Sequence, residues 1–436
     1  LPLVVPVAGL AVVALAALGA RVAAVGAVAI AIASLIAAQP RLQAYVDAGA
    51  PVFRAFQAMH TALPASPAPP VLRMHHQVWW GTQRAIEWYR PTWDIGPQPF
   101  PGDHEWLSVV DHFRGGGQRP VWFLAYIPRT DLAAFDPRTT RQLGRYEPPT
   151  STRTLIGGTR LDSLSWWRLD RPGWMAATGW SLTPEIAGRA LADRQGPQLQ
   201  GADAYLLRSH ASTVVMIGGR YLGPDNGPGA LITATLDGQV VGEWAVGANP
   251  RWFVQWLDLP EGVPEGPGAY ARLVVRATAS GADVTVPVVG LEQFDAAAFN
   301  DYIYAFADGW HGQESDPAAA LEWRWTTGRS ALVVRGASTD LVLSLTGESP
   351  LKNFAEPAQV TVKAGDRVLK VFEPHGEADF SEQIALPAAA LRDSSGRVTI
   401  ETSRTFRPSD QGSADHRELG LRLFSVKISR PSAPQP

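Results

Sequence analysis

The amino-terminal segment constrains this chain most, because it is apolar over a length that only a membrane or a large protein core can bury. Residues 1–20 contain no charged side chain, and after Arg21 a second uncharged stretch runs from residue 22 to residue 38. Each stretch approaches the ~20 residues that cross the hydrocarbon core of a bilayer. We therefore expect a transmembrane helical hairpin over residues 1–39, in contact with membrane lipid.

Two other interpretations of this segment remain open. A cleaved signal peptide has one apolar core of about 7 to 15 residues after a basic start, whereas this run is doubled. A buried hairpin of a soluble protein would carry a polar stripe on its outer face. Arg21, by the positive-inside tendency, places the turn in the cytoplasm and the region after Pro40 outside it, although Arg41 also flanks the second stretch. The hairpin predicts a bacterial inner-membrane protein with a periplasmic soluble region.

Composition excludes several classes of function. The formal net charge of −3 over 436 residues gives no electrostatic basis for binding nucleic acid. Cysteine is absent, which excludes thiol catalysis, thiolate metal sites and disulfides. We expect no cofactor in this chain. Because the sequence opens on Leu1 rather than methionine, we interpret it as the carboxy-terminal part of a longer protein.

The region after the hairpin divides into a linker and a small mixed domain. Residues 40–70 combine apolar side chains at helical spacing with the proline-rich stretch PASPAPP, which predicts an amphipathic helix followed by a linker. Residues 71–155 contain short apolar strands at 71–74 and 121–126 and helical segments near 82–89 and 104–113. Strands interleaved with helices predict a small α/β domain with parallel pairing.

From about residue 156 the pattern changes to short alternating strands separated by Gly, Pro, Asn and Asp, which is typical of β-sandwiches. The pattern also repeats. Gly179-Trp180 and Gly309-Trp310 each precede a set of strands, and each set contains a glycine turn, LDGQVV or KAGDRVL, and then a Leu-Pro step. We therefore predict two tandem jelly-roll-like sandwiches, at residues 156–298 and 299–430, and a chain that is mainly β.

Several segments together resemble a known family. They are the terminal hairpin, VLRMHHQV at 71–78, VWFL at 121–124 with RTD at 129–131, and Gly309-Trp310 with Glu314 and WRWT at 323–326. This combination resembles the carboxy-terminal region of bacterial multi-spanning (GT-C type) glycosyltransferases of the protein-mannosyltransferase and aminoarabinose-transferase type. The resemblance implies a lipid-phosphate-linked sugar donor and a catalytic acidic residue in an early loop. That loop would precede Leu1, so no catalytic residue is assigned and the chain alone is expected to be inactive.

The densest aromatic and charged cluster comprises Trp310, Glu314, Trp323, Arg324 and Trp325. Aromatic faces hold the apolar side of a sugar ring, while carboxylates and guanidinium groups bind its hydroxyls, so the cluster is a candidate carbohydrate site. The first sandwich offers Trp180 and Glu185 in similar places. The interpretation that we favour is packing, in which Trp323 and Trp325 alternate on one strand, pack on Trp310 in the core, and leave Glu314 and Arg324 as an ion pair.

Other chemistries have weaker support. Trp252, Phe253 and Trp256 suggest a groove but are expected to pack in a core. Histidines 60, 75, 76, 104 and 112 lack an acidic partner at metal-ligand spacing. Glu314 and Asp316 could act as the acid and the nucleophile of a glycosidase only if their carboxyl groups faced each other across a cleft.

We therefore predict the accessory, glycan- or acceptor-facing region of a membrane glycosyltransferase. The alternative is a membrane-anchored carbohydrate-binding or scaffolding protein without catalytic activity.

Overall fold

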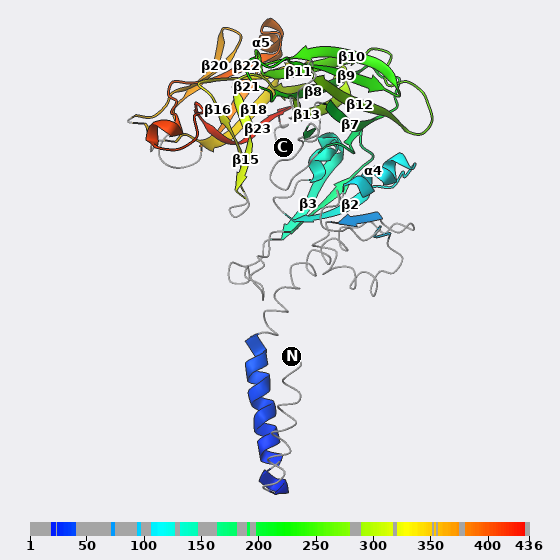
Figure 1. The fold of residues 1–436 in the computed structure, drawn as a ribbon, viewed down its shortest axis with the longest axis vertical. Helices are drawn as coiled ribbons and strands as arrows, with labels where there is room; N and C mark the ends of the chain where they lie inside the picture. The colour runs from blue at the N-terminus through cyan, green and yellow to red at the C-terminus, as the bar shows by residue number, and fades with distance from the viewer. Residues whose placement is uncertain are drawn as a thin grey trace, which may run out of the picture.

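The structure is a computed structural model that describes residues 19–22, 24–40, 71–74, 94–96, 106–126, 131–146, 164–180, 190–191, 198–279, 289–316, 321–350, 353–354, 356–374 and 380–431. One apolar helix, Ala20–Pro40, extends away from the rest of the protein (Figure 1), and its mean hydropathy is 2.2. Its large side chains are exposed, Val25 by 71% and Leu35 by 66%. By length and composition this helix could cross a membrane. The first predicted span and the predicted segment 41–70 lie almost entirely outside the described residues.

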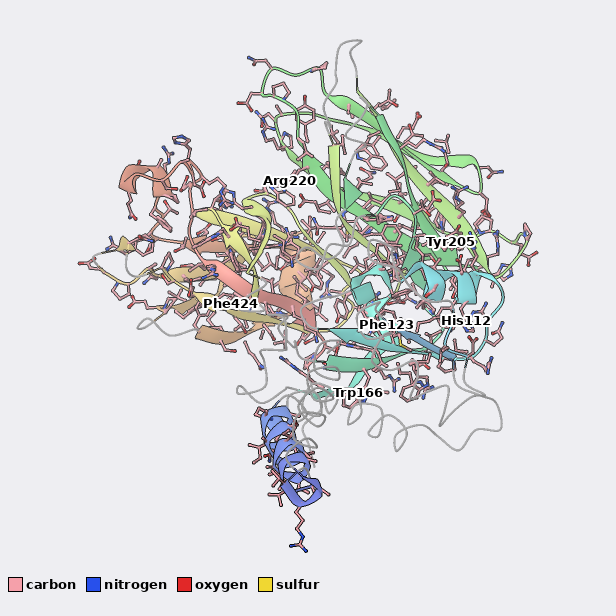
Figure 2. The ribbon with its side chains drawn as sticks, turned by 60° about the horizontal axis from the view of Figure 1, so that its bottom comes forward. His112, Phe123, Trp166, Tyr205, Arg220 and Phe424 are labelled. Atoms are coloured by element: carbon pink, nitrogen blue, oxygen red, sulfur yellow. The ribbon has the colours of Figure 1, made fainter. Side chains whose placement is uncertain are left out.

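A small mixed sheet lies between this helix and the remaining domains (Figure 1). Its strand order is β1 (Val71–Met74), β2 (Val121–Tyr126), β4 (Leu164–Leu169) and β3 (Thr140–Tyr146). The helix α4 (Leu107–Arg114) packs Val109, Val110 and Phe113 into the same core as Val121 and Phe123, the latter labelled in Figure 2. The apolar side chains of β2 therefore have a helix to pack against.

The prediction for this domain was partly wrong. Among the described strands of this sheet, β1 and β2 pair in the parallel sense, whereas β4 pairs with both β2 and β3 in the antiparallel sense. The strand β4 also lies inside the range 156–298 that was predicted as the first sandwich. Its sequence, LSWWRL, has the β character of a sandwich strand, and only its partners show to which sheet it belongs. The predicted helix at 82–89 lies outside the described residues.

The first sandwich has a five-stranded and a four-stranded sheet. The strand order of the larger sheet is β10 (Gln239–Val246), β9 (Ala230–Leu236), β12 (Tyr270–Ala279), β7 (Gln198–Leu207) and β5 (Trp174–Ala176). That of the smaller sheet is β11 (Trp252–Leu259), β8 (Thr213–Tyr221), β13 (Val289–Ala298) and β6 (Ala190–Leu191). Inward-facing side chains such as Val215, Ile232 and Val275 are fully buried, as the alternating pattern predicts.

The second sandwich has two five-stranded sheets. One has the order β14 (Ile303–Phe306), β17 (Arg329–Arg335), β22 (Arg397–Thr402), β19 (Val360–Ala364) and β20 (Arg367–Phe372). The other has the order β15 (Trp310–Asp316), β16 (Leu321–Thr326), β23 (Arg422–Ser429), β18 (Leu341–Glu348) and β21 (Phe380–Leu386). Between β21 and β22 lies the short helix α5 (Ala388–Asp393), and a 3-10 turn, η5 (Pro408–Gln411), precedes β23.

The sequence repeat is a repeat of the fold. Read in chain order, β5, β7, β9, β10 and β12 occupy the same places in their sheet as β14, β17, β19, β20 and β22 in theirs. The predicted glycine turns join equivalent hairpins, with Asp237 (φ 48°) and Gly238 (φ 87°) between β9 and β10 and Gly365 (φ 58°) between β19 and β20. The prediction of a mainly β chain with two tandem jelly-roll-like sandwiches is confirmed.

The two sandwiches pack on each other through an apolar interface. Met216 of β8 and Trp256 of β11 contact the cluster that contains Ile303 and Ala305 of β14. The amide of Gln293 bonds both backbone groups of Phe306, donating to its oxygen at 2.8 Å and accepting from its nitrogen at 2.7 Å. Trp252 and Trp256 therefore pack at this interface rather than line a groove, and Phe253 packs against the first core.

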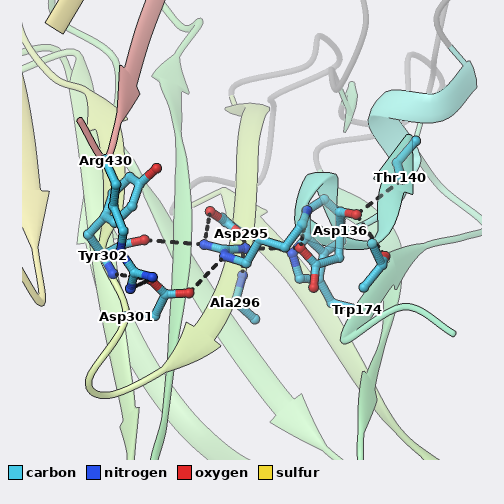
Figure 3. A network of polar contacts seen from close by, with 10 residues as sticks. Asp136, Thr140, Trp174, Asp295, Ala296, Asp301, Tyr302 and Arg430 are labelled. Carbon is cyan, nitrogen blue, oxygen red and sulfur yellow. Dashed lines mark hydrogen bonds and ion pairs between the residues drawn. The ribbon is translucent and has the colours of Figure 1, made fainter. Parts of the chain in front are cut away.

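A partly exposed arginine, Arg138, joins the mixed-sheet domain to both sandwiches through the carboxylates of Asp136, Asp295 and Asp301, which are labelled in Figure 3. Arg138, in the 3-10 turn η2 (Pro137–Thr139), lies 3.0 Å from Asp136, 2.9 Å from Asp295 at the end of the first sandwich and 3.3 Å from Asp301 before β14. Arg430 binds the other oxygen of Asp301 at 2.9 Å. Asp136 is 5% exposed, and this burial raises the pKa of its carboxyl.

Candidate functional site

The predicted cluster divides between the two faces of one sheet, because β15 contains a β-bulge. Trp310 pairs with Thr326, but the register shifts before Gln313, so that Glu314 pairs with Trp323. Paired residues share a face of the sheet. The extra residue therefore turns Trp310 toward the core and Glu314 toward the outer face, where Trp323 also lies.

Trp310 is a core residue. Its side chain is 2% exposed, its Nε1 donates to the Ala331 oxygen at 2.7 Å, and its ring meets Phe306 edge-on at 4.9 Å. Trp180 is also 2% exposed and packs on Phe294 in the first sandwich. Trp310 is therefore enclosed in the core, whereas Trp180, although almost fully buried, borders the cavity between the domains. Glu185 lies outside the described residues.

Arg324 also does not lie beside the other residues of the predicted cluster. It lies between Trp323 and Trp325 on the strand, so it points to the opposite face. Its guanidinium carbon is 4.7 Å from the centroid of Phe306, and its Nη1 is 3.9 Å from Glu292 Oε2. The predicted ion pair between Glu314 and Arg324 is therefore wrong, and so is the predicted packing of Trp323 and Trp325 on Trp310.

Trp323 and Trp325 line an open groove of about 690 Å³ on the outer face. Both side chains are half-buried, and Trp325 meets Phe406 at 6.0 Å with the two rings nearly perpendicular. The other walls come from the end of β18 and from the segment between β22 and β23. Their lining residues are Glu348, Ser349, Pro350, Asn353, Pro408, Gln411, Asp415, Arg417, Leu419 and Arg422.

A chain of charged hydrogen bonds holds one wall of this groove. Trp323 Nε1 donates to Glu314 Oε2 at 3.2 Å, and Glu314 Oε1 accepts from Arg417 Nη1 at 2.5 Å. Arg417 also binds both oxygens of Asp415, with Nε and Nη2 at 2.9 and 2.7 Å. These hydrogen bonds lower the pKa of Asp415 to about 2, so it is ionised at neutral pH. The tryptophan ring is thereby oriented through its indole nitrogen.

Arg422 forms the opposite wall. Its guanidinium carbon lies 3.8 Å from the centroid of the Trp323 ring, a cation–π contact, and its Nη1 donates to Glu348 Oε1 at 2.9 Å. Two polar atoms of this wall, Arg422 Nε and Ser349 Oγ, are buried and have no hydrogen-bond partner among the described residues. Buried polar atoms of this kind are normally satisfied, so they point to a water or a ligand group.

Sequence reasoning found Glu314, Trp323 and Trp325 but missed the residues that complete the groove. Arg417 is 103 positions from Glu314, and Arg422 is 74 positions from Glu348. The only local signal is the pair Asp415 and Arg417 at a spacing of two. Contacts this distant are set by the sandwich topology and have no short-range pattern.

Two of the described histidines, His112 and His311, contact backbone oxygens, whereas His210 and His416 are exposed. His112 lies 3.1 Å from the Arg119 oxygen and His311 lies 2.8 Å from the Glu418 oxygen, and burial lowers the pKa of each. No group of three or more His, Asp or Glu side chains within the described ranges is placed to hold a metal ion. Histidines 60, 75, 76 and 104 and the side chain of Asp316 lie outside those ranges.

No family model matches the sequence, and no curated protein matches it. Among solved structures, the chain is similar to the tandem CBM51 modules of a family 98 glycoside hydrolase from Streptococcus pneumoniae, with 10% identity over 56% of this chain and 83% of that chain and a TM-score of 0.20. It is also similar to the tandem CBM22 domain of Xyn10C from Paenibacillus barcinonensis, with 13% identity, 59% and 94% coverage and a TM-score of 0.20.

A third similar structure, the M60 catalytic domain with CBM51-1 and CBM51-2 of ZmpB from Clostridium perfringens, has 7% identity, 66% and 43% coverage and a TM-score of 0.18. With TM-scores this low, none of the three bears on what this chain binds.

Proposed function

We propose that the groove over Trp323 and Trp325 binds a carbohydrate. The observation that carries the proposal is the pairing of partly exposed tryptophan rings with hydrogen-bonded charged side chains on one open face. Aromatic rings bury the C–H face of a sugar, and ionised groups form strong hydrogen bonds with hydroxyls. A volume of about 690 Å³ lies within the range of small-ligand sites.

The charges of the groove favour a neutral sugar. Each groove arginine is already paired with a carboxylate, Arg417 with Glu314 and Asp415, and Arg422 with Glu348. Three carboxylates against two arginines leave the walls slightly acidic, which would repel a uronic acid or a phosphorylated sugar. Neutral hydroxyls can accept from the arginines and donate to the carboxylates without displacing either pair.

The helix Ala20–Pro40 supports a membrane-anchored location for this binding function. In this proposal the groove faces the periplasm and recruits or holds a glycan near the bilayer. Its place within a larger membrane glycosyltransferase, which the sequence resemblance implies, stays a prediction.

The proposal is tested with the full chain in detergent on an array of neutral and acidic glycans. We expect binding to neutral glycans that is lost in Trp325→Ala and partly kept in Trp325→Phe, because phenylalanine retains a smaller aromatic face. Phe299→Ala is the matched control, since Phe299 is 52% exposed but does not line the groove. Equal binding by wild type and Trp325→Ala would overturn the proposal.

A further inference from the structure

A second cavity lies where the mixed-sheet domain meets both sandwiches. Its volume is about 440 Å³, and its lining includes Phe135 beside the mixed sheet, Trp174 and Phe294 of the first sandwich, and Phe306 and Phe424 of the second. Phe424, labelled in Figure 2, comes from β23, the strand that also supplies Arg422 to the groove.

Trp323 joins this cavity to the groove, because its side chain lines both. Arg422 reinforces the connection, since its guanidinium carbon lies 3.8 Å from the Trp323 ring and 5.3 Å from the Phe424 ring. Aromatic side chains therefore continue from Trp325 in the groove, past Trp323, to Phe424 in the cavity.

The cavity has the same chemistry as the groove. Glu292 accepts from Arg220 Nε at 2.8 Å and lies 3.9 Å from Arg324, so the carboxylate in its wall is balanced by two cations. Asp295 accepts from Trp174 Nε1 at 2.8 Å and from Arg138 at 2.9 Å. The charged side chains of the cavity wall are therefore already paired with one another, and the surfaces open to a ligand are mainly aromatic. Such a lining suits a neutral sugar.

We propose that the ligand is an oligosaccharide chain that runs from the groove across Trp323 into the interdomain cavity. The protein would then recognise an extended glycan through at least two connected subsites, and a single terminal sugar would fill only one of them. This inference rests on the proposed carbohydrate-binding function of the groove and adds the length and the path of its ligand.

The test uses neutral oligosaccharide ladders of mannose, glucose, galactose and arabinose units, from monosaccharide to octasaccharide, titrated against the full chain in detergent by calorimetry. Affinity should rise with chain length until the cavity is filled. Val426→Trp adds bulk to a half-buried side chain of the cavity wall, and Ser425→Trp adds the same bulk at an exposed neighbour that lines neither space. We expect Val426→Trp to lower the affinity for the longest oligosaccharide that binds by about tenfold, which is the contribution of about one aromatic contact. The affinity for the shortest should stay unchanged.

The outcomes separate this inference from the proposed function. In one outcome, the wild type binds glycans, Trp325→Ala does not, and Val426→Trp keeps the rise of affinity with oligosaccharide length. The groove then binds a sugar and the cavity does not. If no ladder binds the wild type, both proposals fall. If Val426→Trp does not fold, Phe424→Ala replaces it, because it removes an aromatic wall of the cavity instead of filling the space. It should likewise lower the affinity for the longest oligosaccharide and leave that for the shortest unchanged.

Discussion

Two tryptophans on neighbouring strands differ in exposure, because Trp310 is enclosed in the core and Trp325 is partly exposed. Trp310→Ala should lower the free energy of unfolding by about 3 to 5 kcal/mol, the usual cost of deleting a large buried aromatic side chain. Glycan binding at 4 °C should be unchanged. Denaturant unfolding of the full chain in detergent, with binding measured in parallel, checks both. Lost binding at unaltered stability would mean that Trp310 belongs to the site.

Asp415 makes the groove sensitive to acid. Hydrogen bonds from Arg417 lower its pKa from 3.8 to about 2, so the folded protein favours the ionised form. A lowered carboxyl pKa contributes stability that is fully present above the unfolded value and is lost as pH falls through the folded value. We expect glycan binding to persist to about pH 4 and to weaken between pH 4 and pH 2. Asp415→Asn should weaken glycan binding at neutral pH and make the affinity nearly independent of pH between about pH 4 and pH 2. If the affinity of this variant falls over that range as the wild type's does, Asp415 is not the titrating group.

Sequence reasoning at the residue scale identified the right strand but not its orientation. The alternation of Trp323, Arg324 and Trp325 correctly places the tryptophans together and the arginine opposite. Which face is buried depends on the bulge between Trp310 and Gln313, and one extra residue reverses every side chain beyond it. Gly312, which lies inside this bulge, is the local signal that the prediction overlooked, so Trp310 and Glu314 were placed together although they lie on opposite faces.

At the scale of elements, the repeated Gly-Trp step depends on a close approach of two backbones. Gly309 has φ 82°, and a Cβ there would overlap the Arg329 carbonyl oxygen of β17. Gly179 stands in the same relation to Gly201 of β7. The alternating strands and the Asp237-Gly238 turn were predictable because their signals are local. The strand β4 was assigned to the wrong domain because its sequence suits either sheet, and only its pairing with β3 and β2 shows to which one it belongs.

Gly309→Ala should therefore destabilise the second sandwich by more than the strain of a left-handed alanine alone. Gly412, with φ 87°, is the matched control, since a Cβ there meets no described atom within 4 Å. We expect Gly412→Ala to cost about 1 to 2 kcal/mol and Gly309→Ala at least about 2 kcal/mol more. Thermal unfolding of both variants measures the difference, and similar melting temperatures would show that the carbonyl of Arg329 moves aside easily.

Arg138 links the three domains beside the interdomain cavity, which its neighbour Pro137 and its partner Asp295 line. Figure 3 shows the carboxylates that bind it. Its partners Asp136 and Asp295 have side chains only 7% and 18% exposed, so removing the guanidinium leaves two poorly solvated carboxylates. Arg138→Leu should cost about 2 to 4 kcal/mol, less than a fully buried pair because Arg138 is itself partly exposed. Arg397→Leu, which breaks the exposed pair with Asp308, should cost less than about 1 kcal/mol.

Arg138→Leu should also change the binding of oligosaccharides. Without Arg138 the cavity walls supplied by different domains are less firmly held, so the gain in affinity with oligosaccharide length should shrink while binding of the shortest ligand persists. Adding Asp295→Asn should recover part of the lost stability, because it removes one unpaired carboxylate. Calorimetric unfolding and ladder titration of the single and double variants test this coupling. A stability loss in Arg138→Leu no larger than in Arg397→Leu would show that the ion pairs of Arg138 are not needed to hold the domains together.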